Sequence, residues 1–164
     1  LAEAGVLVAL TDEENPQLLL TLRSSNLSSH KGEVAFPGGK RDPEDVDIIA
    51  TALREAEEEV ALAARDVQVL GELDQVVSRF GYLITPVLAV VPPGLDYQPN
   101  PDELDAIFMA PLDLFRQPPS GYFERDNISV PSYDYENFHI WGLTAMVIAE
   151  MMNNLWDGNI ALRM

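Results

Sequence analysis

The sequence predicts an α/β (α+β) fold in which helices pack on the faces of a mixed sheet, and two observations carry this prediction. Short apolar runs bounded by Gly, Pro, Asn and Asp recur along the chain, as in strands separated by turns. Two segments, 47–60 and 141–155, instead repeat apolar residues every three or four positions, which is typical of helices. This order of elements favours a layered architecture, and we expect a single domain over residues 1–164.

Three strands are expected before the first helix. The apolar runs 5–10 and 17–22 are separated by Thr-Asp-Glu-Glu-Asn-Pro, which has the composition of a turn. Residues 33–36 form a third, shorter run. The Pro-Gly-Gly stretch at 37–39 then breaks the chain, and we expect a turn there.

The first helix is predicted over residues 47–60 because its apolar residues have helical spacing. These residues are Ile48, Ile49, Ala52, Leu53, Ala56 and Val60. Strands are expected next at 67–73 and 82–92, with a turn at Gly81, and a further strand at 105–111.

The last third of the chain combines a loop, a strand and a helix. A proline-rich loop is expected at 117–121, followed by a strand that precedes Tyr135. The helix predicted from Trp141 to Leu155 has apolar residues at helical spacing, namely Leu143, Met146, Val147, Ile148 and Met151.

Composition restricts the class of function. The chain has no cysteine, which excludes disulfides, thiolate metal ligands and a cysteine nucleophile, and suits a reducing compartment such as the cytoplasm. It contains no run of eighteen apolar residues and no charged-then-apolar leader, so we expect neither a membrane partner nor secretion. A net charge of −17 argues against nucleic acid as a partner, because nucleic-acid binding usually needs a basic face.

The same negative charge would repel a small anionic substrate unless its site gathered cations, either metal ions or basic side chains. The chain has only ten basic residues, and they are unevenly distributed. Four of them fall within nineteen positions that end just past the Gly-Gly pair: Arg23, Lys31, Lys40 and Arg41. This segment is therefore where we expect phosphate contacts.

The first predicted helix carries an acidic cluster. Glu55, Glu58 and Glu59 lie three and four positions apart, so we expect their carboxylates to share one helix face. Like charges at this spacing cost about 0.2–0.5 kcal/mol per pair, and no lysine nearby offsets them. Arg54 could hold one carboxylate through a bidentate contact. Hard oxygen ligands of this kind suit Mg²⁺ or Mn²⁺, completed by water and substrate phosphates.

A solvated acidic helix face is the alternative interpretation of this cluster. The pattern Arg-Glu-x-x-Glu-Glu arises by chance in roughly 0.5% of chains of this composition, which is the risk that any short motif carries. Gly38 and Gly39 lie upstream, where a bare backbone can approach a metal ion or phosphate closely, although alone they indicate an ordinary β-turn. Together the two features favour metal-assisted phosphoryl chemistry.

The segment from Gly39 to Leu62 resembles the Nudix box, Gly-x5-Glu-x7-Arg-Glu-U-x-Glu-Glu-x-Gly-U, where U is aliphatic. The resemblance implies the Nudix-type α/β/α sandwich. Ala61 stands where the box has glycine, so a left-handed cap at this helix end would be strained. The interval between Gly39 and Arg54 is one residue longer than in the box. The position of the first box glutamate therefore has three alternatives: Glu44, Asp45 and Asp47.

The longer interval is a feature of the coenzyme A subgroup of this family, which the chain resembles in three further places. Residues 36–39 are Phe-Pro-Gly-Gly, and residues 19–24 are Leu-Leu-Thr-Leu-Arg-Ser. With Gly32, they are similar to the subgroup signature Leu-Leu-Thr-x-Arg-Ser-x3-Arg-x3-Gly-x3-Phe-Pro-Gly-Gly. Residues 141–145 are similar to the start of the subgroup's carboxy-terminal helix, so the resemblance covers nearly the whole chain.

The subgroup resemblance implies hydrolysis of the diphosphate bond of coenzyme A or its derivatives to 3′,5′-ADP and 4′-phosphopantetheine or its acyl form. Arg54 would orient the carboxylates, and the catalytic base would be Glu55 or a glutamate on a later loop. Glu103 is the candidate on such a loop, where a structural cap is the alternative. The implied ligands of Mg²⁺ or Mn²⁺ are the Gly38 carbonyl and the carboxylates of Glu55, Glu58 and Glu59.

Cationic side chains ahead of the box are the implied substrate contacts. Ser28 stands where the subgroup signature has arginine, and His30 and Lys31 could supply the missing positive charge. Ordinary strand, loop and turn positions are the alternative for each basic residue. The expected substrate-binding residues are Arg23, His30, Lys31 and Lys40.

Two other functions stay open. The same chemistry could act on ADP-ribose, NADH or a nucleoside triphosphate, but residues 76–79 lack the proline that ADP-ribose-cleaving relatives tend to have. The Ser-Gln-Pro-Trp stretch of NADH-cleaving relatives does not occur either. A catalytically inactive binding module with this fold is the second alternative, although such modules tend to lose box glutamates that are all present here. A homodimer is compatible with each of these functions.

Overall fold

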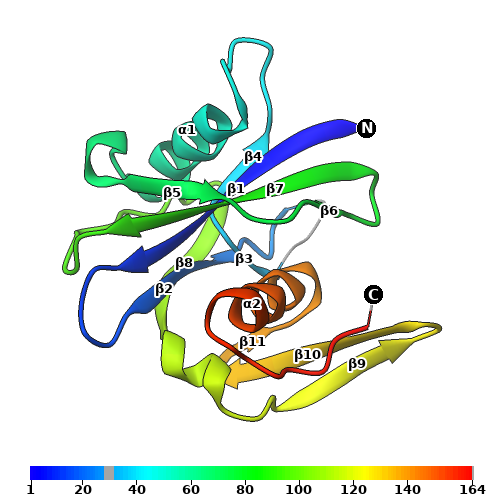
Figure 1. Cartoon of the computed structure of the whole chain (residues 1–164). Coiled ribbons are helices and arrows are strands. Elements are labelled where there is room, and N and C mark those ends of the chain that lie inside the picture. Colours follow the sequence, from blue (N-terminus) through cyan, green and yellow to red (C-terminus); the bar gives the residue numbers. More distant parts are fainter. Residues whose placement is uncertain (28–31, 164) are drawn as a thin grey trace.

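The computed structural model describes residues 1–27 and 32–163 and confirms the expected α/β fold, with a mixed sheet between two helices (Figure 1). Eight strands belong to the main sheet: β1 (Ala2–Thr11), β2 (Gln17–Arg23), β3 (Val34–Ala35), β4 (Gly38–Lys40), β5 (Gln68–Glu72), β6 (Val76–Val77), β7 (Tyr82–Val91) and β8 (Leu104–Pro111). Three more form a second sheet: β9 (Gly121–Arg125), β10 (Ile128–Tyr135) and β11 (Phe138–Ile140). The helices are α1 (Ile48–Val60) and α2 (Gly142–Leu155), and short 3-10 turns cover Ala64–Asp66 and Leu112–Arg116.

Strand β1 lies at the centre of the main sheet. It pairs in parallel with β7 along its whole length, from Ala2 opposite Tyr82 to Thr11 opposite Val91. On its other edge it pairs antiparallel with β2 near Leu10 and with β4 at its amino-terminal half. β2 continues the sheet to β3 and β8. Because β1 is covered on both faces, its sequence is a nearly continuous apolar run instead of an alternation.

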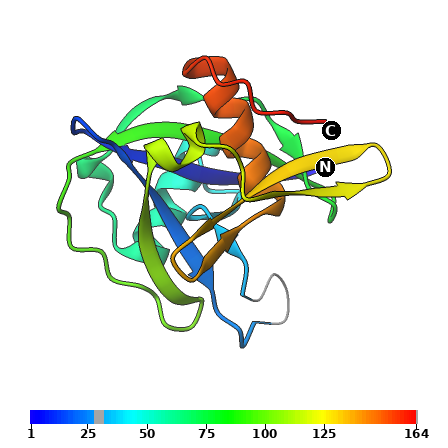
Figure 2. The ribbon, with the colours of Figure 1, turned by 90° about the horizontal axis from the view of Figure 1, so that it is seen from below.

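The two helices cover opposite faces of this sheet, which gives the implied α/β/α layering (Figure 1). Successive side chains of a strand point to opposite faces, so Leu7 packs with Ala56 on the α1 side while Val8 joins the core with Ile148 on the α2 side. Seen from below, α2 crosses the sheet and the β9–β10 hairpin projects to one side (Figure 2). Within the described residues, neither helix has the length and apolar character needed to cross a bilayer.

Two expectations about local structure were wrong or incomplete. The Pro-Gly-Gly stretch is not a turn: Gly38 and Gly39 lie in β4, paired with Val6 and Gly5 of β1. A side chain at Gly38 would place its Cβ atom 2.5 Å from the Gly5 carbonyl oxygen, so glycine is needed for close approach of the two strands. The turn predicted at Gly81 is confirmed, with φ of +83°. Strands β6, β9 and β11 were not predicted.

Candidate active site

Helix α1 begins and ends with recognisable caps. The side chain of Asp47 accepts a hydrogen bond from the Ala50 amide at 2.8 Å, which satisfies one of the free N–H groups of the first turn. At the other end, Ala61 adopts the left-handed conformation, with φ of 60° and ψ of 34°. The strained cap anticipated where the box has glycine is therefore present.

The three glutamates of the acidic cluster differ widely in exposure, which the sequence did not predict. The side chain of Glu58 is 56% exposed and that of Glu55 is 17% exposed, whereas Glu59 as a whole residue is only 2% exposed. Glu59 follows Ala56 by three positions and so falls within the buried stripe of the helix. Its Oε1 accepts a hydrogen bond from the Gly38 amide at 3.0 Å, which is how β4 accommodates a buried carboxylate.

The neighbouring glycine fits against a second carboxylate. A Cβ atom on Gly39 would lie 2.6 Å from the Cδ atom of Glu55, so a side chain at this position would displace the carboxylate. The Gly-Gly pair of β4 thus contacts two of the three glutamates directly. The bare backbone thus lies in an extended strand against acidic side chains, and its close approach to a metal ion or phosphate stays a prediction.

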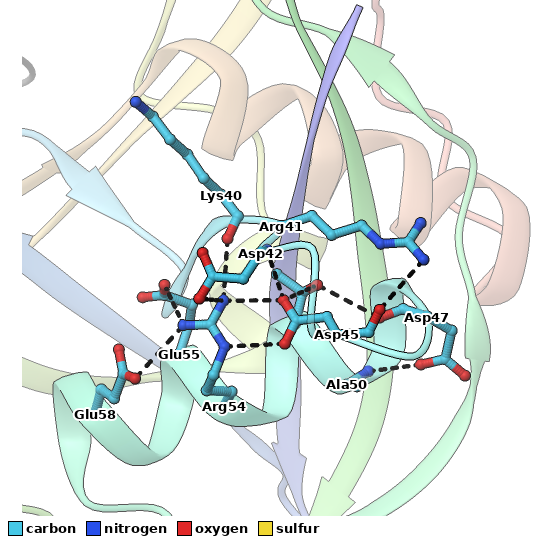
Figure 3. Close-up of polar contacts among 10 residues, drawn as sticks. Lys40, Arg41, Asp42, Asp45, Asp47, Ala50, Arg54, Glu55 and Glu58 are labelled. Atoms are coloured by element: carbon cyan, nitrogen blue, oxygen red, sulfur yellow. Dashed lines mark hydrogen bonds and ion pairs between the residues drawn. The ribbon is translucent and has the colours of Figure 1, made fainter.

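Arg54 is the centre of the polar network on α1 (Figure 3). Its Nε and Nη2 atoms each donate to one oxygen of Asp45 at 3.0 Å, forming a bidentate pair. Its Nη1 donates to Glu55 at 3.0 Å and to Glu58 at 3.5 Å, and its Nη2 also donates to the Lys40 carbonyl at 3.1 Å. The bidentate contact expected of Arg54 is therefore made to Asp45, and the same guanidinium also serves Glu55 and Glu58.

Asp45 is the residue of the lengthened loop that holds Arg54 most closely, with Asp42 at 3.5 Å from the same guanidinium. It also accepts hydrogen bonds from the Thr51 hydroxyl at 2.8 Å and the Asp42 amide at 2.9 Å. These contacts, above all those from Arg54, hold the pKa of Asp45 well below its usual range. Of the other two alternatives for the first box glutamate, Asp47 caps the helix and Glu44 is exposed.

Burial and repulsion set the electrostatics around Glu59. Burial raises the pKa of Glu59 to about 8, against the opposing effect of the Gly38 amide, and repulsion from Glu103 and Glu55 adds to the increase. Attraction to Arg23 acts in the opposite direction. Burial also raises the pKa of Glu55, whereas its hydrogen bond from Arg54 lowers it. Glu103 and Arg23, predicted from distant parts of the sequence, are thus close enough to α1 to act on its carboxylates.

The loop that carries Glu103 is fastened to the carboxy-terminal end of α1. The Asn100 amide donates to the Glu59 carbonyl at 2.8 Å, so it satisfies a free C=O group of the last helical turn. The Asn100 carbonyl in turn accepts from the Glu103 amide at 3.0 Å, and the Glu103 carbonyl accepts from the Ser24 amide at 2.8 Å. These bonds fix Glu103 between α1 and the end of β2.

The predicted substrate-binding residues have different positions. Arg23 lies at an irregularity at the end of β2, and its Nε atom is buried with no hydrogen-bond partner among the described residues. The Lys40 side chain points away from the carboxylates (Figure 3), and its ammonium lies 5.4 Å from the centre of the Tyr82 ring. Ser28, His30 and Lys31 lie outside the described residues.

A divalent cation of the Mg²⁺ type requires oxygen donors, which the acidic side chains of this site supply. Across residues 1–27 and 32–163, no three acidic or histidine side chains already meet as a metal site, and Arg54 engages two of the glutamates. Glu59 nevertheless is a buried carboxylate that Glu55 and Glu103 repel, an environment that a cation would neutralise. Carboxylate oxygens also match the preference of Mg²⁺ and Mn²⁺, which keep several water or phosphate ligands. The residues therefore fit such an ion.

Sequence reasoning missed two residues of this site. Thr51, which binds Asp45, is a buried polar residue on the packing side of the predicted helix. Because buried polar groups need a hydrogen-bond partner, its position in the apolar pattern indicated a polar contact. Asn100 accepts from the Asp102 amide in a local turn, which the Asn-Pro-Asp sequence indicates. Its contact with the Glu59 carbonyl depends on the fold and had no signal in the sequence.

Comparison with known proteins gives the same family at the level of sequence. Residues 2–129 match the profile of the NUDIX domain family. A protein of Photorhabdus laumondii named uncharacterized Nudix hydrolase NudL is 46% identical over 153 residues, which cover 90% of this chain and 82% of that protein.

Two solved structures share the fold. A Nudix hydrolase from M. smegmatis, RenU, has a TM-score of 0.59 and 24% identity, covering 68% of this chain and 71% of its own. A MutT/nudix family protein from Enterococcus faecalis has a TM-score of 0.61 and 14% identity, and the likeness covers 95% of this chain and 62% of that protein. The second comparison extends beyond the residues that match the family profile.

Proposed function

This chain belongs to the Nudix hydrolase family, and from that premise we propose that it hydrolyses the diphosphate bond of coenzyme A or its derivatives. The products would be 3′,5′-ADP and 4′-phosphopantetheine or its acyl form. The observation that carries the proposal is the position of the subgroup signature at 19–39. This segment includes strands β2, β3 and β4, which place the Gly38 amide 3.0 Å from Glu59 and bring Arg23 near enough to attract the same carboxylate.

Nudix hydrolases act on small-molecule substrates and use divalent metal ions. In this chain Glu55, Glu58, Glu59 and the Gly38 carbonyl would hold Mg²⁺ or Mn²⁺. When bound, the ion would neutralise charge on the diphosphate and on the phosphorus under attack. Arg54 keeps Glu55 and Glu58 in place through the hydrogen bonds described above, and Asp45 fixes Arg54 in turn.

The reaction needs a base for the attacking water. Its oxygen bonds to one phosphorus, the bridging P–O bond breaks, and the released proton passes to a carboxylate. Glu103 is the proposed base, with Glu55 as the alternative. Among the described residues, Arg54 donates to the carboxylate of Glu55 and not to that of Glu103, so the lone pairs of Glu103 are less committed to a cation. Its backbone bonds to Asn100 and Ser24 hold it beside α1.

The first experiment measures turnover of coenzyme A, dephospho-coenzyme A, ADP-ribose, NADH and a nucleoside triphosphate, with products identified by mass spectrometry. We expect coenzyme A to have the highest kcat/KM in Mg²⁺, EDTA to abolish turnover and excess Mg²⁺ to restore it. Full activity in EDTA would contradict the metal mechanism. A higher kcat/KM for another diphosphate would make that compound the substrate in place of coenzyme A. If the protein hydrolyses none of these compounds, a binding module would be the function that is left.

The role of Arg23 is tested on the same panel. A charge-assisted contact with phosphate is worth about 1.5–3 kcal/mol, so Arg23→Ala should lower kcat/KM for coenzyme A by roughly ten- to a hundredfold. Arg116→Ala is the matched control, since Arg116 bonds Asp113 at the end of a 3-10 turn. Equal losses on coenzyme A, dephospho-coenzyme A and ADP-ribose would place Arg23 at the common diphosphate or in the fold.

Three broader proposals accompany this function. We take residues 1–164 as one domain, which is supported by the packing of α2 and β10 into the same core as β1 and β2. A cytoplasmic location is proposed because the chain has no cysteine. A homodimer is the alternative to a monomer, and light scattering on the purified protein distinguishes the two.

A further inference from the structure

The hydroxyl of Thr51 connects the first turns of α1 to the loop that precedes the helix. Thr51 is fully buried, and its hydroxyl donates to Oδ2 of Asp45 at 2.8 Å. The same hydroxyl approaches the Asp47 carbonyl at 3.4 Å, the longer contact that a helical threonine makes with the preceding turn. The bond to Asp45 is therefore the main hydrogen bond of this buried group.

Asp45 accepts hydrogen bonds from three parts of the chain, and these differ in how firmly they fix its carboxylate. The Asp42 amide belongs to the same loop, which is exposed over most of residues 42–47, so it moves with Asp45. Arg54 has a long side chain that is 28% exposed, and it is the group that Asp45 has to place. Thr51 is β-branched, so its side chain has few rotamers in a helix. Of the donors that the structure describes, the Thr51 hydroxyl is the one with a fixed and buried position.

The position of Asp45 is transmitted to the acidic cluster through the guanidinium of Arg54 (Figure 3). Its Nε and Nη2 atoms donate to Asp45. Its Nη1 atom donates to Glu55 at 3.0 Å and to Glu58 at 3.5 Å. Because a guanidinium is planar and rigid, a tilt that follows Asp45 would also move Nη1 away from both glutamates.

The order of these residues along α1 agrees with such a connection. Arg54 follows Thr51 by three positions, and Glu55 follows it by four. Glu58 follows Arg54 by four positions. Residues at these intervals lie on neighbouring parts of one helix side, so the buried threonine is next to the side chains that it would influence.

We propose that Thr51 is a positioning residue that orients Glu55 and Glu58 for the metal ion through Asp45 and Arg54. Its hydroxyl fixes the Asp45 carboxylate against α1, and that carboxylate fixes the plane of the guanidinium. In this role Thr51 contacts neither the substrate nor the ion. The inference rests on the proposed function only in that Glu55 and Glu58 hold a divalent ion, and it is independent of which diphosphate is hydrolysed.

The test separates the hydroxyl of Thr51 from its packing. Thr51→Val keeps the branched shape and removes the donor, whereas Thr51→Ser keeps the donor and removes a buried methyl group. Thr144→Val is the matched control, because Thr144 is a buried threonine of α2 whose hydroxyl donates to the Val34 carbonyl at 2.9 Å. Each variant is studied as the full chain, and its melting temperature and circular dichroism show whether it is folded.

The first measurement is the affinity for Mn²⁺ without substrate, from the electron paramagnetic resonance signal of the free ion. We expect Thr51→Val to weaken Mn²⁺ binding about tenfold, since loss of a residue that orients metal ligands typically weakens affinity by about 10–100-fold. Thr51→Ser should bind Mn²⁺ within about twofold of wild type, although its melting temperature falls. Thr144→Val should lower the melting temperature and leave the Mn²⁺ affinity unchanged.

The second measurement observes Arg54 without any metal. Its Nε–H donates to Asp45 at 3.0 Å, so the NMR signal of this proton should exchange slowly with solvent. Thr51→Val should speed the exchange about tenfold, whereas Thr51→Ser and Thr144→Val should stay within about twofold of wild type. Arg54→Lys, which removes the Nε–H group, identifies the signal.

A double-mutant cycle tests the route through Asp45. In the Asp45→Ala background the acceptor is absent, so adding Thr51→Val should change the Mn²⁺ affinity by less than about twofold. Losses that simply add would show that Thr51 acts by another route, and they would overturn the proposal.

Two further results would also overturn it. Wild-type Mn²⁺ affinity and wild-type Arg54 exchange in Thr51→Val would mean that the loop holds Asp45 without the hydroxyl. Equal losses of affinity in Thr51→Val and Thr51→Ser would assign the effect to packing. A wild-type protein that binds no Mn²⁺ would instead contradict the metal site of the proposed function, and the exchange of the Arg54 signal would still decide whether Thr51 positions the guanidinium.

Discussion

Helices α1 and α2 cover opposite faces of the same sheet, but they differ in what they bury. The buried side of α2 is made of apolar residues and one threonine, and it faces the larger of the two cores. The buried side of α1 includes Thr51 and Glu59, and its exposed side carries Arg54 with its acidic partners. We infer that α2 contributes mainly to stability. The packing of α1 is weaker, because a carboxylate beside Gly38 occupies part of its buried side.

The largest effect should come from the carboxylates of α1. If Glu58 and Glu59 hold the metal ion, Glu58→Gln or Glu59→Gln should lower kcat by about three orders of magnitude, which corresponds to about 4 kcal/mol in the activation barrier. Circular dichroism and the melting temperature should show no loss of fold. Glu57→Gln is the matched control, an exposed glutamate on the same helix, and should retain activity. Inactivation that coincides with unfolding would assign these residues to structure.

A substitution on α2 should have the opposite effect, a loss of stability without a loss of activity. Ile148 is fully buried against the sheet, so Ile148→Ala should reduce the free energy of unfolding by about 3 kcal/mol through lost contacts and a residual cavity. Because α2 carries none of the proposed catalytic residues, kcat of the folded fraction should stay within about twofold of wild type. Urea denaturation and initial rates at a temperature well below the transition measure the two quantities. A large drop in kcat without loss of stability would remove the contrast between the helices.

The third test concerns the charge of Glu59 without metal. Its pKa in the folded protein, about 8, exceeds the ordinary value of 4.5, so the folded state binds this proton more tightly than the unfolded state. The resulting stabilisation is complete below the unfolded-state pKa and is lost as pH rises through 8. In EDTA, the stability of wild type relative to Glu59→Gln should therefore fall by on the order of 2 kcal/mol between pH 6 and 9, at about 1.4 kcal/mol per pKa unit. A difference that does not vary with pH would mean that Glu59 is solvated.

Much of the fold follows from local patterns in the sequence. The apolar spacing over 47–60 predicts α1 to within one residue, because an amphipathic helix of this length has a clear period. Strands β6 and β11 have two and three residues, too few for any period, and β9 is exposed over most of its length, so it has no buried face to mark it. Such strands form because they pair with a neighbouring strand, and no local sequence pattern specifies that neighbour.

The site was predictable in composition and less so in geometry. The residues near α1 were identified from the acidic cluster and the Gly-Gly pair, and Glu103 from a polar turn. The burial of Glu59 was not foreseen, because it depends on the Gly38 amide, 21 positions away in the chain, being placed to donate to it. The choice of Asp45 over Glu44 as the partner of Arg54 likewise depends on the path of the loop, since both have the same charge.

The smallest expected effect is a change in the free energy of unfolding caused by substitutions at one end of each helix. Ala61, the residue after α1, has φ of 60°, and Gly142, the first residue of α2, has φ of +63°, so an alanine and a glycine both have φ in the left-handed region. That conformation costs an L-residue roughly 1–2 kcal/mol, partly offset by the greater entropy of glycine in the unfolded chain. Ala61→Gly should thus raise the free energy of unfolding by about 0.5–1 kcal/mol.

Gly142→Ala should lower the free energy of unfolding by a similar amount, because no atom lies within 4 Å of the added Cβ and only backbone strain is introduced. Urea denaturation of both single variants and of the double variant measures these changes. The sites are at different helices on opposite sides of the sheet, so the two effects should add, and the double variant should resemble wild type. Destabilisation by Ala61→Gly would mean that the methyl group of Ala61 contributes packing that outweighs its strain. The deviation of this chain from the box glycine would then be an adaptation of the helix end.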